Sequence, residues 1–511
     1  MNPSTEISFW AFIRRPENRK SLLWALGISV VYFIGFKLLY PYPDFFSDSY
    51  SYLFAAYAHL DVSIWPIGYS KFLAGVHHIT YSDTALVAIQ YLLVQLSALY
   101  FYFTIIYFYH TSNLTRQVLF YFLFANPLSL YLCNTINSDA LFGALSIAWF
   151  TQLLWVIKRP KKYLIITQAL LVFLCFTIRN NAYYYPLVAA VAFLLSRQNN
   201  WYKLAGIVMP ILFLAPFILY TQHKVYQLTG TKQFSLFTGW QLANNALYIY
   251  DQISIDPEEL PTPEAKELNL IAQEFFKNTK ADEWRDGLES YVGNFFIRQP
   301  EAPLKQFYSR HFQSKNEFEG VVNWGKASAA MEPFGKTVIL NNPVPYLRYF
   351  VWPNVFHYFI PPLSHLERFN YGINQVEPIA SYWFHYRSTK IRCWSNEFQG
   401  IILFPFTAFF LMFNGYFPFQ LWLFAKKRGF RKDLGKSEWL VAVFLLLNFG
   451  FSLVATVNIL RYQFVPMIVL LAFGMVTNDW LEEFTKIEKK EFVLIPEKSA
   501  LYRVRRRQKL L

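Results

Sequence analysis

Apolar runs of about 20 residues recur along the chain, and this is the length a helix needs to cross a bilayer core. They predict an all-α, polytopic helical membrane protein of about ten transmembrane helices. Short polar loops separate most of the runs, which indicates antiparallel helical neighbours. The expected spans are residues 21–40, 84–109, 117–133, 140–157, 163–178, 187–195, 204–220, 400–424, 440–457 and 465–480.

Basic clusters mark one side of this arrangement. They precede the first span as RRPENRK, follow the fourth as KRPKK, follow the eighth as AKKRGFRKDLGK and close the chain as RVRRRQ. Cytoplasmic loops carry an excess of Lys and Arg, so both termini are predicted to be cytoplasmic. The first span lacks a cleavage pattern, so no removable signal peptide is expected.

A long polar segment, residues 221–395, separates the seventh and eighth spans. It contains prolines and equal numbers of basic and acidic residues, and it is predicted to be mostly helical and extracytoplasmic. The aromatic run at 346–360 is expected to be interfacial or re-entrant. The resulting organisation is an N-terminal membrane module (1–220), this outer segment, C-terminal membrane helices (396–480) and a basic tail (481–511).

Composition supports a membrane protein. The 511 residues are 54% hydrophobic, with a mean hydropathy of +0.22 and a net charge of +14. Because the charge excess lies outside the long segment and flanks the spans, it fits the positive-inside rule, and no nucleic-acid partner is expected. Three scattered cysteines, Cys133, Cys175 and Cys393, predict neither a disulfide framework nor a zinc site.

Acidic residues are rare in the first half of the chain, yet they gather in the first outer loop, residues 41–83. That loop contains Asp44, Asp48, Asp61 and Asp83. Asp48 opens a predicted helix, where the helix dipole keeps a carboxylate ionised and able to accept a proton from an alcohol. A simple helix-capping role for Asp48 or Ser47 is equally compatible with the sequence. Asp44 is the alternative base or a partner, and Asp61 is expected to cap the following turn.

Few basic residues fall at the outer ends of the spans. Lys71, Arg179 and Arg461 are the candidates for binding a substrate phosphate, because basic groups placed against the positive-inside trend need anionic partners. Pairing with a loop aspartate or with lipid headgroups is the alternative. Aromatic residues of the same loop, Tyr52, Trp65 and Tyr69, are candidates for contacting substrate. No spacing of ligands predicts a metal site, although a divalent metal ion is left open as a cofactor.

The predicted cytoplasmic loops lack a phosphate-cradling glycine motif, so a nucleotide-dependent reaction is not expected there. Five pieces of the membrane half form a pattern: FSDSYSYLFAAYAH, WPIGYSKFL, INSDALFGAL, TIRNNAYYYP and LRYQFVP. Together they resemble the GT-C glycosyltransferases that use polyprenyl-phosphate sugars, such as protein O-mannosyltransferases and aminoarabinose transferases of lipid A. Many GT-C members carry an acidic pair in the first loop, whereas Ser49 follows Asp48 here.

The resemblance implies inverting transfer of a sugar from a polyprenyl-phosphate donor to a hydroxyl of a glycan, lipid or protein acceptor. Asp48 takes the place of the catalytic loop aspartate, and Arg461 resembles an arginine near the last outer turn. The expected location is the extracytoplasmic face of a bacterial inner membrane.

Three other functions remain open from the sequence. An O-antigen ligase or polysaccharide polymerase would use Arg and His of a long outer loop, for which the candidates are His311, Arg348, His357, His365 and Arg387. A lipid-linked sugar flippase or transporter would line its midplane with charge and show two similar halves, and neither is evident. A purely structural membrane protein would not need the cluster of acidic residues.

Overall fold

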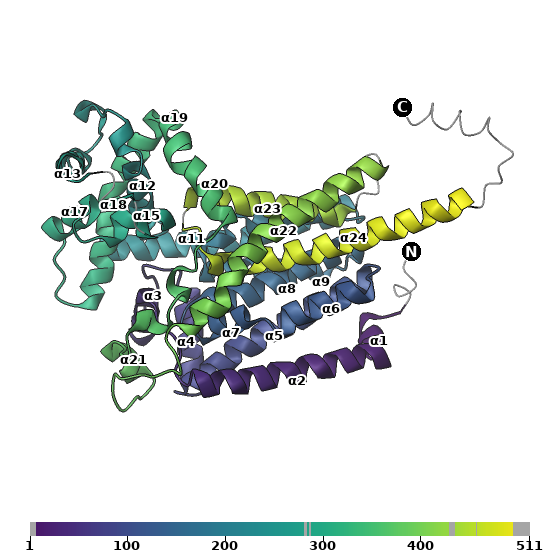
Figure 1. Ribbon diagram of the computed structural model, residues 1–511. Coiled ribbons are helices and arrows are strands. Elements are labelled where there is room, and N and C mark those ends of the chain that lie inside the picture. The colour runs from purple at the N-terminus through teal and green to yellow at the C-terminus, as the bar shows by residue number, and fades with distance from the viewer. Residues whose placement is uncertain (1–6, 281–283, 286–287, 429–434, 456, 494–511) are drawn as a thin grey trace, which may run out of the picture.

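The computed structural model describes residues 7–280, 284–285, 288–428, 435–455 and 457–493. Within these ranges the chain forms helices and no strands, so the prediction of an all-α fold is confirmed (Figure 1). Two isolated β-bridges are present in the described ranges, between Asp44 and Thr135 and between Gln375 and Lys390. The predicted basic tail, residues 481–511, is described only as far as residue 493, where it continues α24, and half of the cluster at 425–436 lies outside the described residues.

Seven of the described helices are long and apolar enough to cross a membrane. They correspond to predicted spans one, two, four, seven, eight, nine and ten. Their bounds are α2 (Pro16–Leu39), α5 (Asp83–Phe108), α8 (Asp139–Lys158), α11 (Asn200–Thr229), α22 (Phe398–Arg428), α23 (Lys436–Ala455) and α24 (Phe464–Val493).

The other three predicted spans are shorter helices. Residues 117–133 form two pieces, α6 (Asn113–Phe124) and α7 (Pro127–Asn134), because Pro127 cannot continue the hydrogen-bond ladder of α6. The two remaining spans are α9 (Tyr163–Ile178) and α10 (Tyr185–Leu195), joined by a short 3-10 turn. Helix α11 continues past residue 220, so the membrane module has no break at its predicted boundary.

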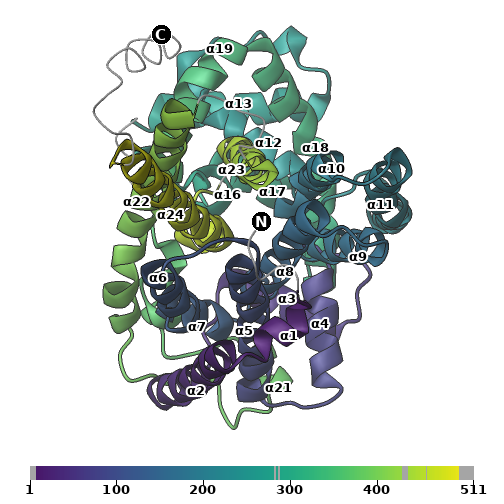
Figure 2. The same ribbon diagram turned by 90° about the vertical axis from the view of Figure 1, so that its right-hand side faces the viewer.

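The long helices lie side by side and define two ends of a bundle (Figures 1 and 2). Helix α1 (Phe9–Ile13) lies at one end, where Tyr107 donates a hydrogen bond to the carbonyl of Ile7 and Lys436 donates to the carbonyl of Leu195. The KRPKK cluster at 158–162 joins α8 to α9 at this same end, which we call the basic end.

The opposite end, which we call the covered end, is capped by the helices of residues 230–396, at the left of Figure 1. Helices α12 (Thr238–Leu247), α13 (Pro263–Asn278), α17 (Pro303–His311) and α18 (Glu317–Asn341) enclose a hydrophobic core of their own. Trp240, Trp284, Phe296 and Phe334 are buried in it. This core is separate from the one formed by the membrane helices.

The last part of the covering segment packs onto the membrane helices and onto the first outer loop. Helix α20 (Trp352–Phe359) contacts α22 and α23, and α21 (Pro378–Trp383) contacts α3 (Ser47–Tyr57). The hydroxyl of Tyr386 donates to Asp83 over 2.6 Å. The backbone N–H of Trp394 donates to the carbonyl of Leu39 over 2.8 Å. Residues 352–396 therefore hold the first outer loop in place.

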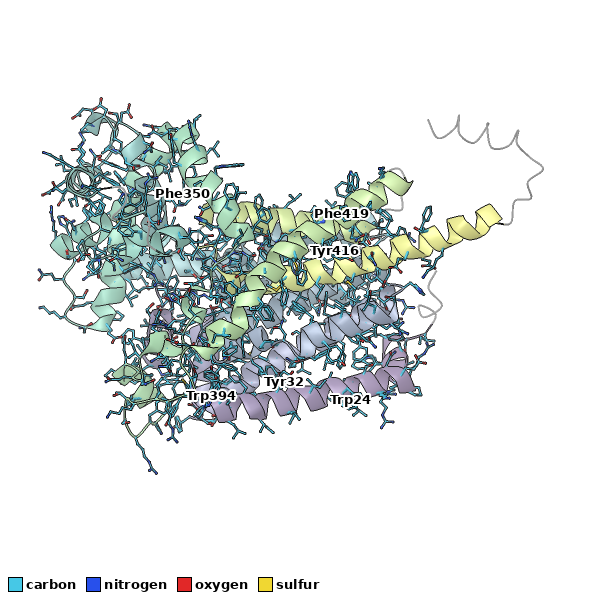
Figure 3. All side chains as sticks on the ribbon, in the orientation of Figure 1. Trp24, Tyr32, Phe350, Trp394, Tyr416 and Phe419 are labelled. Carbon is cyan, nitrogen blue, oxygen red and sulfur yellow. The ribbon has the colours of Figure 1, made fainter. Side chains whose placement is uncertain are left out.

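Helices α2 and α22 present apolar side chains outward. Trp24 and Tyr32 are exposed along α2, and Phe419 is exposed on α22 (Figure 3). A helix at the periphery of a soluble protein would bury its apolar side chains, whereas a lipid-facing helix exposes them. These exposed faces fit the hydrocarbon region of a bilayer.

Candidate active site at the covered end

Three charged residues that are far apart in the sequence meet at the covered end of the bundle. Asp139 is the first residue of α8, Arg179 follows the last residue of α9, and Arg461 lies in the 3-10 turn before α24. Arg461 Nη1 lies 3.0 Å from Asp139 Oδ2, and Arg179 Nη1 donates to Asp139 Oδ1. Both arginines therefore share one carboxylate.

This cluster is buried. The side chains of Asp139 and Arg461 are each 4% exposed, and that of Arg179 is 11% exposed. Two guanidinium groups and one carboxylate leave an excess positive charge, which favours a second anion nearby. The Nε of Arg461 is buried without a hydrogen-bond partner among the described atoms.

Asp48 supplies the second anion, but loosely. Its Oδ2 lies 4.0 Å from Arg461 Nη2, and its side chain is 23% exposed. Asp48 is thus the most accessible of the four charged side chains. It lies in the first turn of α3, where the free N–H groups and the helix dipole favour a carboxylate.

Asp48 and Ser47 do not cap α3 in the described hydrogen bonds. The cap comes from Ser49, whose hydroxyl accepts the backbone N–H of Phe46 over 2.8 Å. The predicted helix start is confirmed, and so is the second predicted helix, which is α4 (Gly68–His77). With capping done by Ser49, the carboxylate of Asp48 is left facing Arg461.

Aromatic rings enclose the arginines. Tyr462 lies against both guanidinium groups. The centroid of its ring is 4.2 Å from Cζ of Arg179 and 5.1 Å from Cζ of Arg461. Phe46 lies 5.0 Å from the guanidinium of Arg461. Beside the cluster is a small cavity of about 20 Å³. Its lining includes Asp139, Arg179 and Arg461. That volume is about one water.

The predicted aromatic contacts fall at different depths. Tyr52 is buried next to the cluster, and its hydroxyl is 3.1 Å from that of Ser138, the residue before Asp139. Tyr69 lies behind it, fully buried, and donates to Gln90 over 2.9 Å. Trp65 packs against Phe237 of the covering segment, in a separate small cavity.

Lys71 is not among the residues that the structure brings to Asp139. Its Nζ lies 3.9 Å from Asp61, which also pairs with Lys224 over 3.0 Å. All three of these side chains are about a third to a half exposed, so the cluster is a surface ion-pair network. Asp61, expected to cap a turn, instead joins α4 to α11.

Asp44 is enclosed and holds neighbouring loops. Its backbone pairs with residues 134–136, and its Oδ1 accepts the backbone N–H of Asn370 over 2.7 Å. Gln399 donates to its other oxygen over 3.4 Å. Burial raises the pKa of Asp44 to about 7, against the opposing effect of these hydrogen bonds. Only 3% of the surface of Asp44 is exposed, so it is not accessible to a substrate.

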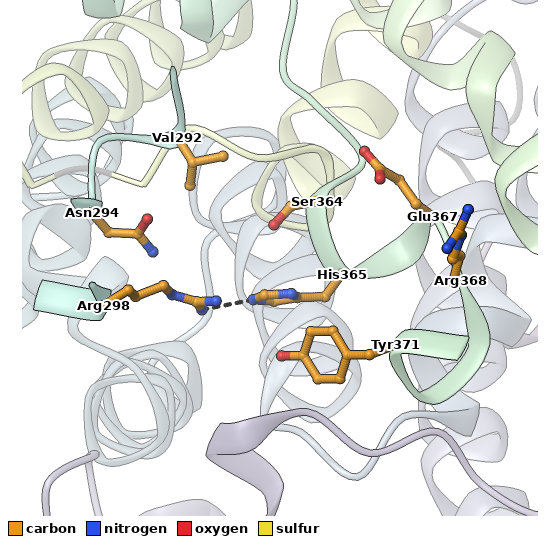
Figure 4. A pocket seen from close by; sticks show the side chains of 8 residues that line it. All are labelled: Val292, Asn294, Arg298, Ser364, His365, Glu367, Arg368 and Tyr371. Atoms are coloured by element: carbon orange, nitrogen blue, oxygen red, sulfur yellow. Dashed lines mark hydrogen bonds between the residues drawn. The ribbon is translucent and has the colours of Figure 1, made fainter. Parts of the chain in front are cut away.

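A larger, open pocket is lined by eight residues, which Figure 4 shows. Two of them, His365 and Tyr371, contact the ring of Phe46. The pocket has a volume of about 240 Å³ and forms between the Val292–Arg298 stretch and residues 364–371. Arg298 Nη2 lies 2.7 Å from His365 Nε2. Burial and the charges of Arg461 and Arg298 lower the pKa of His365 to about 2, so its ring is neutral and accepts this hydrogen bond.

The other predicted loop candidates are scattered. His311 pairs with Glu267 on the surface over 2.9 Å, and His357 packs against Tyr291 with a pKa lowered by burial to about 4. Arg348 lies over Tyr349. In the described ranges, no group of three or more His, Cys, Asp or Glu side chains is placed to hold a metal ion.

The sequence did not single out Asp139 as a site residue. The available signal was its rarity, because it is one of five acidic residues between Asn18 and Tyr250 and falls at the same predicted face as Arg179 and Arg461. Known proteins offer no further guide: no protein family, no curated protein and no solved structure matches this chain.

Proposed function

We propose that this protein is a membrane glycosyltransferase that moves a sugar from a polyprenyl-phosphate donor to an acceptor hydroxyl. The observation that carries the proposal is the position of Asp48. It is a partly exposed carboxylate, 4.0 Å from a buried arginine, at the end of a bundle of apolar helices. A polar reaction centre at this level suits a substrate whose lipid part stays in the bilayer.

In the proposed reaction Asp48 accepts the proton of the acceptor hydroxyl. The hydroxyl oxygen attacks the anomeric carbon from the face opposite the phosphate, and the bond from that carbon to the phosphate oxygen breaks. Polyprenyl phosphate leaves with the bonding electrons, and the configuration inverts. A positioned base of this kind typically contributes ~10²–10⁴-fold to the rate.

Arg461 and Arg179 are proposed to bind the donor phosphate. Asp139 neutralises only one of the two guanidinium groups, and Asp48 lies at the long limit of an ion pair. A phosphate oxygen can therefore replace Asp48 as the anion nearest to Arg461. Asp48 is then released for the acceptor, while the arginines stabilise the departing phosphate in a site of low dielectric constant.

We propose that the covered end is extracytoplasmic. The KRPKK cluster lies at the opposite, basic end, and positive loops face the cytoplasm. The proposed location is a bacterial inner membrane with both termini cytoplasmic. Helices α6 with α7, α9 and α10 would complete ten crossings of a GT-C-like fold. The acceptor is a glycan, lipid or protein.

Mass spectrometry of a deletion strain tests the function. Surface glycans and lipids should lack one sugar residue, and the corresponding polyprenyl-phosphate sugar should accumulate. An unchanged profile in both fractions would contradict the proposal.

A second candidate is an O-antigen ligase or polysaccharide polymerase, favoured by the Arg298–His365 pair in the open pocket. In that case His365→Gln should abolish product formation while Asp48→Asn retains it. The first proposal, with Asp48 as the base, expects Asp48→Asn to abolish product formation.

A further inference from the structure

The open pocket beside Phe46 has a backbone that L-residues rarely adopt. Ser364, Asn370 and Tyr371 all have positive φ angles, of 53°, 46° and 56°. Only five non-glycine residues in the described ranges do. Two of them, Ser364 and Tyr371, line this pocket, and Asn370 directly precedes Tyr371. Such backbone strain persists where the surrounding structure enforces it, and it concentrates at ligand sites.

Asp44 enforces this conformation from behind. Its carboxylate accepts the backbone N–H of Asn370, and the side-chain amide of Asn370 donates to the carbonyl of Gln375 over 2.8 Å. Asn370, and with it the backbone that leads to Tyr371, is thus fixed before any ligand arrives. A fixed polar wall reduces the entropy lost on binding.

The lining offers both hydrogen-bond donors and acceptors. Asn294, Arg298, Ser364 and the hydroxyl of Tyr371 face the pocket (Figure 4). Glu367 adds a carboxyl group whose pKa is raised by burial. The positive charge of Arg368 is already opposed by Glu397, 3.4 Å away.

This mixture fits a neutral group rich in hydroxyls better than an anion. A phosphate would meet the carboxyl group of Glu367, whereas a sugar hydroxyl can donate to Glu367 and accept from Arg298. The rings of His365 and Tyr371, 4.9 Å apart, add apolar surface of the kind that packs against the C–H groups of a pyranose. The volume of about 240 Å³ admits a group much larger than water.

One side chain, Phe46, lies between the pocket and the proposed reaction centre. The Phe46 ring lies 5.1 Å from His365 and 6.1 Å from Tyr371, and the guanidinium of Arg461 lies 5.0 Å from the same ring. Asp48 is two residues further along the chain. The pocket and Arg461 therefore both lie against the same buried ring, two residues from Asp48.

We propose that this pocket binds one neutral sugar unit of a glycan acceptor and so makes the acceptor a saccharide. Binding of the sugar stands on the pocket alone, while its role as acceptor rests on the proposed function.

The test is a titration of the full-length protein in lipid nanodiscs, because detergents with sugar headgroups would compete. The probes are glucose, galactose, mannose, N-acetylglucosamine and inorganic phosphate. Binding of each sugar is measured by saturation-transfer NMR, and binding of phosphate is measured by its competition with the sugar. We expect at least one sugar to bind with a Kd of about a millimolar, and Arg298→Gln to weaken it about tenfold, as for loss of a charge-assisted hydrogen bond. Tyr371→Phe, a change that leaves the ring in place, should weaken it by a few-fold.

Arg348→Gln is the matched control, because Arg348 is an exposed arginine of the same covering segment. It should bind the sugar as the unchanged protein does. Equal binding by Arg298→Gln and Arg348→Gln, binding of phosphate in preference to every sugar, or no binding at all would each overturn the inference. Asp48→Asn separates the two proposals, since it should keep sugar binding, whereas its turnover reports on the proposed function alone.

Discussion

Asp48 and Arg461 come from opposite ends of the sequence, and their side chains lie 4.0 Å apart at the covered end of the bundle. The separation is too long for a strong hydrogen bond, whereas Asp139 holds the same arginine at 3.0 Å. One carboxylate therefore fixes the arginine, and the other stays available. This difference leads to opposite expectations for the two aspartates.

Asp139→Asn should destabilise the fold. It leaves Arg179 and Arg461 buried without a full countercharge, and breaking a buried ion pair costs about 3–5 kcal/mol. A marked drop in the thermal unfolding midpoint in detergent would measure it. Glu258→Gln is the control, because Glu258 pairs with Lys266 while 84% exposed, and such surface pairs contribute about 0–1 kcal/mol. Equal midpoints for the two variants would contradict a structural role for Asp139.

The pH dependence of stability should reveal Asp44. Its pKa is about 7 in the folded protein, against 3.8 for an exposed aspartate. The folded state thus binds an extra proton between these values, and the contribution to stability falls as pH rises from about 4 to 7. Asp44→Asn keeps an oxygen for Asn370 and should remove this part of the pH dependence. Unfolding midpoints measured across pH 4–8 that fall equally in both proteins would exclude Asp44 as the source.

Membrane sidedness can be read by labelling single cysteines in whole cells. In a Cys393→Ser background, Ser314→Cys in the covering segment should react with an impermeant maleimide before lysis. Lys161→Cys at the basic end should react only after lysis. Both positions are exposed, and the remaining cysteines, Cys133 and Cys175, are buried. The reverse order of labelling would place the proposed site in the cytoplasm.

Local features of the site were readable from the sequence. The sequence predicts a helix that opens around Asp48 and a second helix after Pro66, and both form, as α3 and α4. The long spans were predicted from apolar runs, since lipid imposes one length on all of them. These predictions depend only on neighbouring residues.

Long-range pairings were not readable. The sequence gives no reason for Asp139 to meet residues 179 and 461, because that contact depends on how α8, α9 and α24 pack. Nor does it place residues 352–396 around the first outer loop, where Asp44 meets Asn370. Lys71 was grouped with the arginines by its predicted side of the membrane, but its nearest partner is Asp61.

The most direct test of the account is complementation of a deletion strain with Asp48→Asn, read by mass spectrometry of the glycan. Asp61→Asn is the matched control, since Asp61 lies in the same loop but pairs with surface lysines. The account predicts that Asp48→Asn reaches the membrane in normal amounts with an unchanged unfolding midpoint, yet restores no product, while Asp61→Asn restores it fully. Near-normal product from Asp48→Asn would contradict the central claim.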